Sequence, residues 1–367
     1  MWGVKDLHKV RRKVSRSRYS VKRILGKELY NFYQGGEFWN DYPEPVRKPT
    51  VIQKQHDALM AGHFVKSKKL AYSNLRKHPD NDDMAFNAGW AKLSDGKVQQ
   101  GYKLLDRGRA NMVWGDPHCG SGMPLWEGQE NVTVLLRLER GLGDQIHQVR
   151  YARNLKALGC RVNVSCSSEL APVIRRAEGV DAVMDHRAAC GVMHDYHLPA
   201  MSAPIQLGLT QEMLDGSSYI KPYSDIDVVP GRIGLRWQGN PLYEHSTKRL
   251  FPPDLLFSVL GGRDCISLQK GEGSELRPRW VKSILLDTWQ DTMEAIASCE
   301  QVISSCTAIA HLAAAMGIRT TTIIPMVPYY LWTYPGNKTP YYDSMTLYRQ
   351  TKPDNWNAPF EKLAHAA

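Results

Sequence analysis

The sequence predicts an α/β protein in which two doubly wound parallel sheets follow an α-helical segment. Between residues 51 and 109, apolar residues recur at every third or fourth position, which is typical of amphipathic helices. From residue 131 onward, short β-rich runs alternate with helical stretches, and strands joined by helices form parallel sheets with right-handed crossovers. The chain of 367 residues is long enough for two or three domains.

The helical segment carries a repeat signal. Two similar short segments begin at Gly62 and Gly96, which are 34 residues apart. Each leads into a predicted helix, and Pro79 ends the helix that follows Gly62. This spacing is the period of tetratricopeptide repeats, in which a small residue separates paired helices. One and a half repeats cannot form a free superhelix, so we expect these helices to dock on the domain that follows.

Two sets of strands are expected after the helices. The first set covers residues 132–138, 161–165 and 181–184, with helices at 145–158 and 169–176. The second set covers residues 232–237, 265–268, 281–286, 302–304 and 320–324, with helices at 253–260, 292–298 and 307–316. A polar linker at 223–230 separates the sets. We therefore expect a basic arm and connector at 1–50, the helical segment at 51–125, and α/β domains at 126–225 and 226–367.

Composition excludes several classes of protein. With 43% hydrophobic and 23% charged residues the chain is of ordinary globular type, and it has neither a long apolar span nor an apolar signal region. We expect a soluble cytoplasmic protein without a membrane span. Seven cysteines without a Cys-x-x-Cys pair argue against disulfides and zinc. Asp225 and Asp227 lie in the linker, and His194 and His197 fit a short strand entering a turn, so no metal is expected.

Positive charge is concentrated at the N-terminus. Residues 1–27 hold ten basic residues and one acidic residue, a net charge of +9, whereas the other 340 residues sum to +1. Such an arm suits a nucleic-acid backbone, an anionic membrane surface or an acidic partner; the alternative is a solubilising tail. The candidate anion-binding residues are Arg11, Arg12, Lys13, Arg16, Arg18, Lys22 and Arg23.

A glycine turn follows the first expected strand. Gly141 and Gly143 allow a sharp turn and a close ligand, and Asp144 stands at the start of the next helix. Its carboxylate could accept a proton from a hydroxyl nucleophile. The alternative is that Asp144 caps its helix, which is common for Asp at that position.

Three further motifs follow strands of the second set. Asn240 lies in an abrupt turn after the first strand, and the basic pair Lys248 and Arg249 could reach a diphosphate at the same sheet edge; a solvated loop is the alternative. Gln269 and Lys270 follow the next strand.

The last motif opens an alanine-rich helix. The Thr307 hydroxyl and the free N–H groups at this helix start would form an anion pocket. His311 lies one turn further along and could donate to a phosphate or a sugar hydroxyl, with a satisfied core histidine as the alternative.

The order of these motifs resembles that in tetratricopeptide glycosyltransferases of bacteria and viruses. Those enzymes are similar to the O-GlcNAc transferase catalytic region and, more distantly, to heptosyltransferases. The resemblance covers about residues 55–365 and rests on 124–128, 141–144, 150–152, 237–241, 267–271 and 307–313. It implies a GT-B fold of two Rossmann-like domains and a nucleotide-diphosphate sugar as co-substrate, for which we expect a UDP-linked sugar. It also implies that no metal or other cofactor is needed and that the reaction inverts the anomeric carbon.

Position by position, the resemblance implies that Asp144 is the general base. It implies that the donor is held by Asn240, Lys248, Arg249, Gln269, Lys270, Thr307 and His311. The sequence departs from the family at Cys306, where an Asp is common.

The acceptor stays open between a hydroxymethylated base in phage-type DNA, to which the basic arm points, and a protein or a glycan such as lipopolysaccharide. A non-catalytic binding module that retains a transferase fold is a further alternative.

Overall fold

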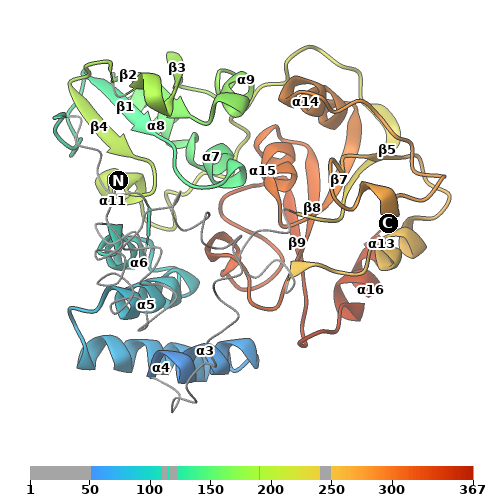
Figure 1. The fold of residues 1–367 in the computed structure, drawn as a ribbon, viewed down its shortest axis with the longest axis horizontal. Helices are drawn as coiled ribbons and strands as arrows, with labels where there is room; N and C mark the ends of the chain where they lie inside the picture. The colour runs from blue at the N-terminus through green and yellow to red at the C-terminus, as the bar shows by residue number, and fades with distance from the viewer. Residues whose placement is uncertain (1–50, 110–113, 116–121, 190, 240–248, 367) are drawn as a thin grey trace, which may run out of the picture.

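The computed structural model describes residues 51–109, 114–115, 122–189, 191–239 and 249–366 (Figure 1). The basic arm and connector at 1–50, and with them the seven candidate anion-binding residues, lie outside the described residues. So do Asn240 and Lys248.

The N-terminal helices form two successive hairpins, as expected. They are α3 (Val51–Met60), α4 (Phe64–Lys77), α5 (Asp82–Ser94) and α6 (Val98–Asp106). Gly62 and Gly96 occupy the turns inside the two hairpins with φ of 77° and 73°, a conformation that favours glycine. The helical segment is therefore confirmed, whereas its membership of the tetratricopeptide class stays a prediction.

The helical segment docks on the first sheet, also as expected. The Gln99 side chain on α6 donates to the Leu209 carbonyl at 3.2 Å. Arg109, just beyond α6, forms a buried ion pair with Glu139 at the end of the first strand, with 2.6 Å between Nη1 and Oε1. Glu139 also accepts from the backbone N–H of Met201 at 2.9 Å. One buried carboxylate thus joins the helices to two loops of the sheet.

The first sheet has four parallel strands in the order β3-β2-β1-β4. Its strands are β1 (Thr133–Arg137), β2 (Arg161–Cys166), β3 (Ala182–Asp185) and β4 (Tyr196–Pro199). Its helices are α7 (Leu142–Gln148), α8 (Tyr151–Ala157), α9 (Ala171–Ile174), α10 (His186–Ala189) and α11 (Ala203–Gln206). The single helix expected at 145–158 was wrong in one respect, because the chain breaks it into α7 and α8 at residues 149–150.

The second sheet has five parallel strands in the order β6-β5-β7-β8-β9. Its strands are β5 (Val229–Arg236), β6 (Cys265–Ser267), β7 (Cys299–Ser305), β8 (Arg319–Ile324) and β9 (Met345–Arg349). Its helices are α13 (Pro253–Leu260), α14 (Trp289–Ala297), α15 (Ala308–Ala315) and α16 (Asn357–Ala366). The strand expected at 281–286 was wrong: this segment makes one isolated bridge to the edge strand β6, between Lys282 and Ile266, and then runs partly exposed toward α14.

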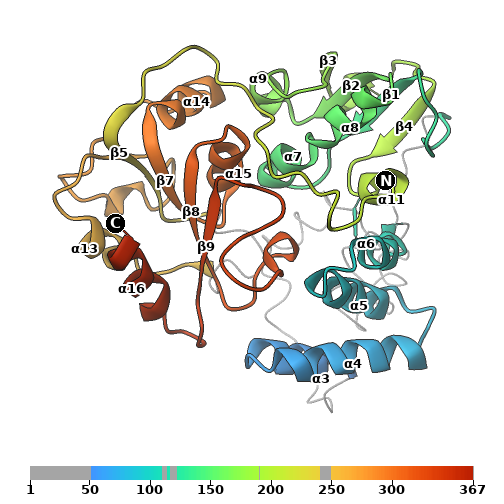
Figure 2. The same cartoon turned by 180° about the vertical axis from the view of Figure 1, so that it is seen from behind.

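The two sheets share one core. The largest cluster of buried apolar residues draws on the helical segment, the first sheet and the face of the second sheet under α14 and α15. A second cluster fills the opposite face, under α13 and α16, so the second sheet is covered on both sides as a doubly wound sheet requires. Figures 1 and 2 show α7 and α15 side by side between the sheets.

Candidate functional site

The strand orders identify where each sheet can bind a ligand. All strands run parallel, but the side on which the chain adds the next strand changes between β1 and β4 in the first sheet and between β5 and β7 in the second. Ligands of open parallel sheets bind beyond the carboxyl ends of the strands at such switch points. The segments that leave β1 and β7 there lead into α7 and α15, the two helices that pack against each other. The site predicted from the sequence therefore lies between the two sheets.

The glycine turn of the first sheet contacts the helix start of the second. A Cβ atom on Gly143 would lie 3.3 Å from the Cα of Ala308 and 3.1 Å from Cδ2 of His311. A side chain at this position would press on the α15 backbone and on the His311 ring, so the glycine allows the close approach of α7 and α15. The predicted Gly143 and the predicted start of α15 are thus brought together by the fold.

Asp144 is half-buried at this contact and receives two hydrogen bonds. The Tyr329 hydroxyl donates to Oδ1 at 2.7 Å, and the Gly141 backbone N–H donates to Oδ2 at 3.2 Å. Burial raises the pKa of Asp144, while the bonds from Tyr329 and Gly141 and the charge of Arg140 oppose that rise. Asp144 is the third residue of α7, and by accepting from the N–H of the N-cap residue Gly141 it makes the capping contact that the alternative expected. It also presents a carboxylate of raised pKa, as a proton acceptor near neutral pH needs.

The start of α15 is more accessible than the rest of that helix. Residues 306–308 are half-buried, whereas 309–316 are buried. The Thr307 hydroxyl lies 3.0 Å from the Ser304 hydroxyl and does not cap the helix. The Cys306 carbonyl accepts a hydrogen bond from Arg249 at 3.1 Å, and the Cys306 thiol accepts one from Trp332 at 3.1 Å. The first N–H groups of α15 therefore stand beside a guanidinium group, which favours an anion.

A second arginine, which the sequence reasoning missed, lies at the same edge. Arg236 ends β5 in register with Ser304, and its Nη1 donates to the carbonyls of Leu268 and Lys270 at 3.2 and 3.4 Å. Its Nε is buried and has no hydrogen-bond partner among the described residues. Burial, and then the nearby charge of Arg249, lower the pKa of Arg236 to about 10. An arginine at the end of a strand, directly after the buried residues 233–235, was the available signal.

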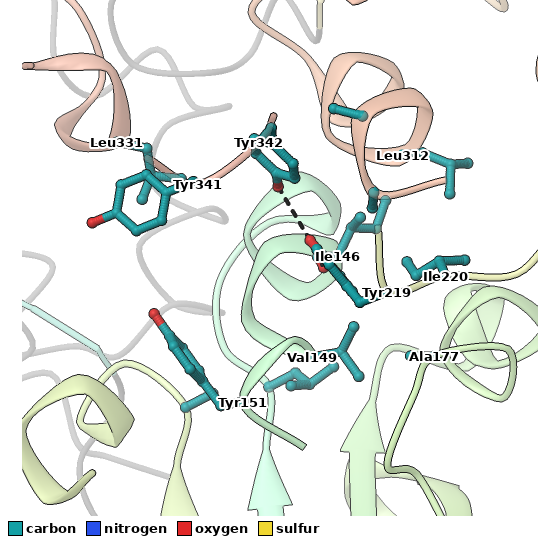
Figure 3. Packing of buried hydrophobic residues seen from close by; sticks show 14 of the residues in the cluster. Ile146, Val149, Tyr151, Ala177, Tyr219, Ile220, Leu312, Leu331, Tyr341 and Tyr342 are labelled. Atoms are coloured by element: carbon teal, nitrogen blue, oxygen red, sulfur yellow. Dashed lines mark hydrogen bonds between the residues drawn. The ribbon is translucent and has the colours of Figure 1, made fainter. Parts of the chain in front are cut away.

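His311 is held like a core residue. Its Nδ1 lies 2.9 Å from the Tyr342 hydroxyl, and its ring stacks on Trp332 with 5.1 Å between centroids. Burial and the charge of Arg150 lower the pKa of His311 to about 3, so the ring is neutral at physiological pH. The Tyr342 hydroxyl also points at Tyr219 above α7 (Figure 3). The geometry matches the core-histidine alternative, and a donor contact by His311 stays a prediction.

Gln269 and Lys270 hold loops together at this edge. The buried Gln269 accepts from the N–H of Gln238 at 3.0 Å and donates to the Glu272 carbonyl at 2.7 Å. The ammonium of Lys270 donates to the carbonyls of Leu286 and Asp287, ahead of α14, at 2.6 and 2.9 Å. Both side chains stand at the predicted sheet edge, and their contact with a donor stays a prediction.

The described residues lack two further features, a metal-ligand cluster and a membrane-spanning helix. Across the described ranges, no three or more His, Cys, Asp and Glu side chains are grouped as metal ligands would be. His197 instead bonds to the Met123 carbonyl at 2.9 Å, and His194 bonds to Asn163 at 3.0 Å. No helix in the part of the chain that the structure describes is long and apolar enough to span a bilayer. Independence from metals and a cytoplasmic location stay predictions.

Comparison with known proteins gives distant structural matches. No protein-family model and no curated protein matches the chain. E. coli heptosyltransferase WaaC with ADP-2-deoxy-2-fluoro heptose aligns over 64% of this chain and 100% of its own, with 13% identity and a TM-score of 0.45. A family 9 glycosyl transferase from Veillonella parvula aligns over 64% and 92%, with 10% identity and a TM-score of 0.44.

A Thermobaculum terrenum O-GlcNAc transferase covers more of the chain with a lower score. It aligns over 89% of this chain and 85% of its own, with 12% identity and a TM-score of 0.27. Matches at these identities and scores assign no role to any residue of this chain.

Proposed function

We propose that this protein is an inverting, metal-independent glycosyltransferase of GT-B architecture, which moves a sugar from a nucleotide-diphosphate sugar to an acceptor hydroxyl. One observation carries the proposal: a carboxylate of raised pKa on the first sheet, Asp144, stands at the contact with a cationic helix start on the second, where Arg249 bonds to Cys306. The proposed domains at 51–125, 126–225 and 226–367 place the acceptor on the first α/β domain and the donor on the second.

The proposed reaction uses both sides of this contact. Asp144 takes the proton of the acceptor hydroxyl, whose oxygen attacks the anomeric carbon from the face opposite the leaving group. The bond from that carbon to the diphosphate oxygen breaks, and the electron pair leaves with the diphosphate. The positive charge of Arg249 and the N-terminus of α15 stabilise the charge that builds there. A single displacement inverts the configuration of the anomeric carbon.

Some residues of the proposed donor site have contacts that support their role, and others are only proposed. Arg249 and Thr307 support it directly, because both lie at the accessible start of α15. The half-buried Arg236 adds a second cationic group at the same edge. Asn240, Lys248, Gln269, Lys270 and His311 remain proposed donor contacts. The resemblance suggests a UDP-linked sugar, and the E. coli WaaC structure was solved with an ADP-linked one, so both nucleotides belong in a test.

For the acceptor we propose a hydroxyl of a glycan or a protein. The alternative, a hydroxymethylated DNA base, depends on the basic arm, which lies outside the described residues, and no contact within them supports it. DNA affinity can be measured against salt for the full chain and for a chain lacking residues 1–27. A steep fall in affinity with salt that disappears with the arm supports DNA, and no binding at low salt excludes it.

Donor turnover tests the proposal. The full chain is incubated with UDP-, ADP-, GDP- and dTDP-sugars without acceptor, and release of the nucleoside diphosphate is followed over hours. A transferase should slowly release the nucleoside diphosphate from its own donor among these four, because water attacks the sugar in place of the acceptor hydroxyl. Binding of a nucleotide sugar without any release, even with glycan and protein acceptors added, would favour the non-catalytic binding module. Neither binding nor release with any donor would overturn the proposal.

A further inference from the structure

We propose that Tyr329 is a positioning residue for the Asp144 carboxylate, and that Trp90 of the helical segment holds Tyr329 in place. The inference rests on the proposed role of Asp144 as the base. Neither Tyr329 nor Trp90 belongs to a sequence motif singled out above. Both are identified by their contacts at the site.

The hydrogen bonds at Asp144 fix the plane of its carboxylate. Tyr329 holds Oδ1 from the second sheet at 2.7 Å, and Gly141 holds Oδ2 from the first at 3.2 Å. Two donors on different oxygens prevent rotation of the group. Each carboxylate oxygen accepts more than one hydrogen bond, so lone pairs remain for the acceptor proton. Tyr329 keeps its own proton throughout; it orients the base without exchanging a proton with the substrate.

The bond from Tyr329 to Asp144 links the two sheets. Tyr329 follows β8 in the second sheet and directly precedes the 3-10 turn Tyr330–Trp332, whereas Asp144 stands on α7 of the first sheet. The two residues are 185 positions apart in the chain. The carboxylate is therefore oriented only while the sheets face each other as they do here.

The helical segment contacts the ring of Tyr329 through Trp90. The ring of Trp90, on α5, meets the ring of Tyr329 edge-on with 6.0 Å between centroids, and meets Tyr330 in the same manner at 5.9 Å. Tyr329 and Tyr330 pack on each other at 4.5 Å. Such aromatic pairs add stabilisation beyond that of their buried area and favour edge-on or offset geometries, so they select one orientation of the Tyr329 ring. The helical hairpins thus reach the site through an aromatic contact.

Loss of the tyrosine hydroxyl has a defined electrostatic consequence. The hydrogen bond from Tyr329 stabilises the ionised carboxylate and so opposes the rise that burial produces in the pKa of Asp144. Tyr329→Phe removes that opposition, and the pKa of Asp144 then rises further. A merely structural role for the tyrosine would lower stability without moving this titration.

The test compares transfer rate with pH for the wild type, Tyr329→Phe and Trp90→Leu. The acidic limb of the Tyr329→Phe profile should move up by about one pH unit, the effect of one charge-assisted hydrogen bond. Trp90→Leu should move it in the same direction by less. Tyr72→Phe is the matched control, because it removes another tyrosine–aspartate bond, 2.8 Å to Asp95, far from the site; its profile should not move.

Failure of this inference is distinguishable from failure of the proposed function. If Asp144→Asn abolishes transfer but Tyr329→Phe keeps the wild-type profile, the positioning role is wrong and the base role stands. If Asp144→Asn transfers normally, the base role itself is wrong. Carboxyl NMR titration of the full chain, with Asp144 assigned from the Asp144→Asn spectrum, gives a readout without turnover: an unchanged Asp144 titration in Tyr329→Phe overturns the inference.

Discussion

Gly143 of α7 and Ala308 of α15 are in direct contact: a Cβ atom on Gly143 would stand 3.3 Å from the Cα of Ala308. The glycine turn that carries the proposed base and the helix start that carries the proposed donor site are thus neighbours across the two sheets. The proposed base and the proposed donor site are therefore close enough to act on one sugar.

Gly143→Ala should destabilise the protein by about 1–2 kcal/mol, because the added methyl group must displace the α15 backbone or the His311 ring. Chemical denaturation measures this change. Gly191→Ala is the control, since its Cβ would meet no atom closer than 3.7 Å. Equal stability of the two variants would show that α7 and α15 adjust without cost.

Arg236→Gln should weaken binding of nucleoside diphosphates by about tenfold, because it removes a charge from the proposed donor edge. Thermal stability should change little, since the loss of the hydrogen bonds to the Leu268 and Lys270 carbonyls is offset by removal of a charge that burial beside Arg249 disfavours. Isothermal titration calorimetry measures the affinity. Arg319→Gln, which removes an exposed arginine paired with Glu300, is the control and should bind normally. Unchanged affinity in Arg236→Gln would place the diphosphate elsewhere.

Stability should fall as the pH drops below about 6.5, where histidine ionises in an unfolded chain. The folded protein holds His311 neutral down to about pH 3, so only the unfolded state takes up this proton. This difference costs about 1.4 kcal/mol per pH unit. Denaturation from pH 7 to 4 should therefore show a shallower pH dependence for His311→Gln than for the wild type. The exposed His78→Gln is the control, and identical slopes for all three proteins would show that His311 takes up a proton in the fold.

Glu139→Gln should destabilise the protein by about 3 kcal/mol, because it leaves the buried Arg109 charge without its nearest carboxylate. The exposed pair of Glu300 and Arg319 provides the comparison, and Glu300→Gln should cost less than about 1 kcal/mol. Urea denaturation measures both. Equal costs would indicate that the helical segment does not depend on the Arg109–Glu139 pair for docking.

Local signals predicted the parts of the fold that local sequence determines. The glycine turn at 141–144 and the helix beginning after Thr307 each follow a buried strand, so each could be predicted to lie at the carboxyl edge of its own sheet. The packing of α7 against α15 then brings the two edges together. The strand expected at 281–286 does not form, because its neighbour β6 is an edge strand of three residues and makes only one bridge to this segment, between Ile266 and Lys282. Strand β9 was not foreseen.

The residues that complete the candidate site could not be predicted in the same way. Tyr329 meets Asp144 across 185 positions of chain, and Trp90 reaches Tyr329 from a separate helical segment. Nothing in the local sequence around either aromatic residue indicates such a partner. The position of His311 in its motif suggested a ligand contact, whereas its hydrogen bond to Tyr342 became visible only in the fold; the donor contact stays a prediction.

The most direct measurement is the transfer rate of Asp144→Asn beside its donor affinity, with the donor found in the nucleotide-sugar panel. The rate should fall at least a hundredfold, the usual contribution of a general base, while the donor dissociation constant stays nearly unchanged. Thermal stability should not decrease, because ionised Asp144 is disfavoured by burial. Transfer at the wild-type rate would contradict the assignment of Asp144 as the base and, with it, the account of the site.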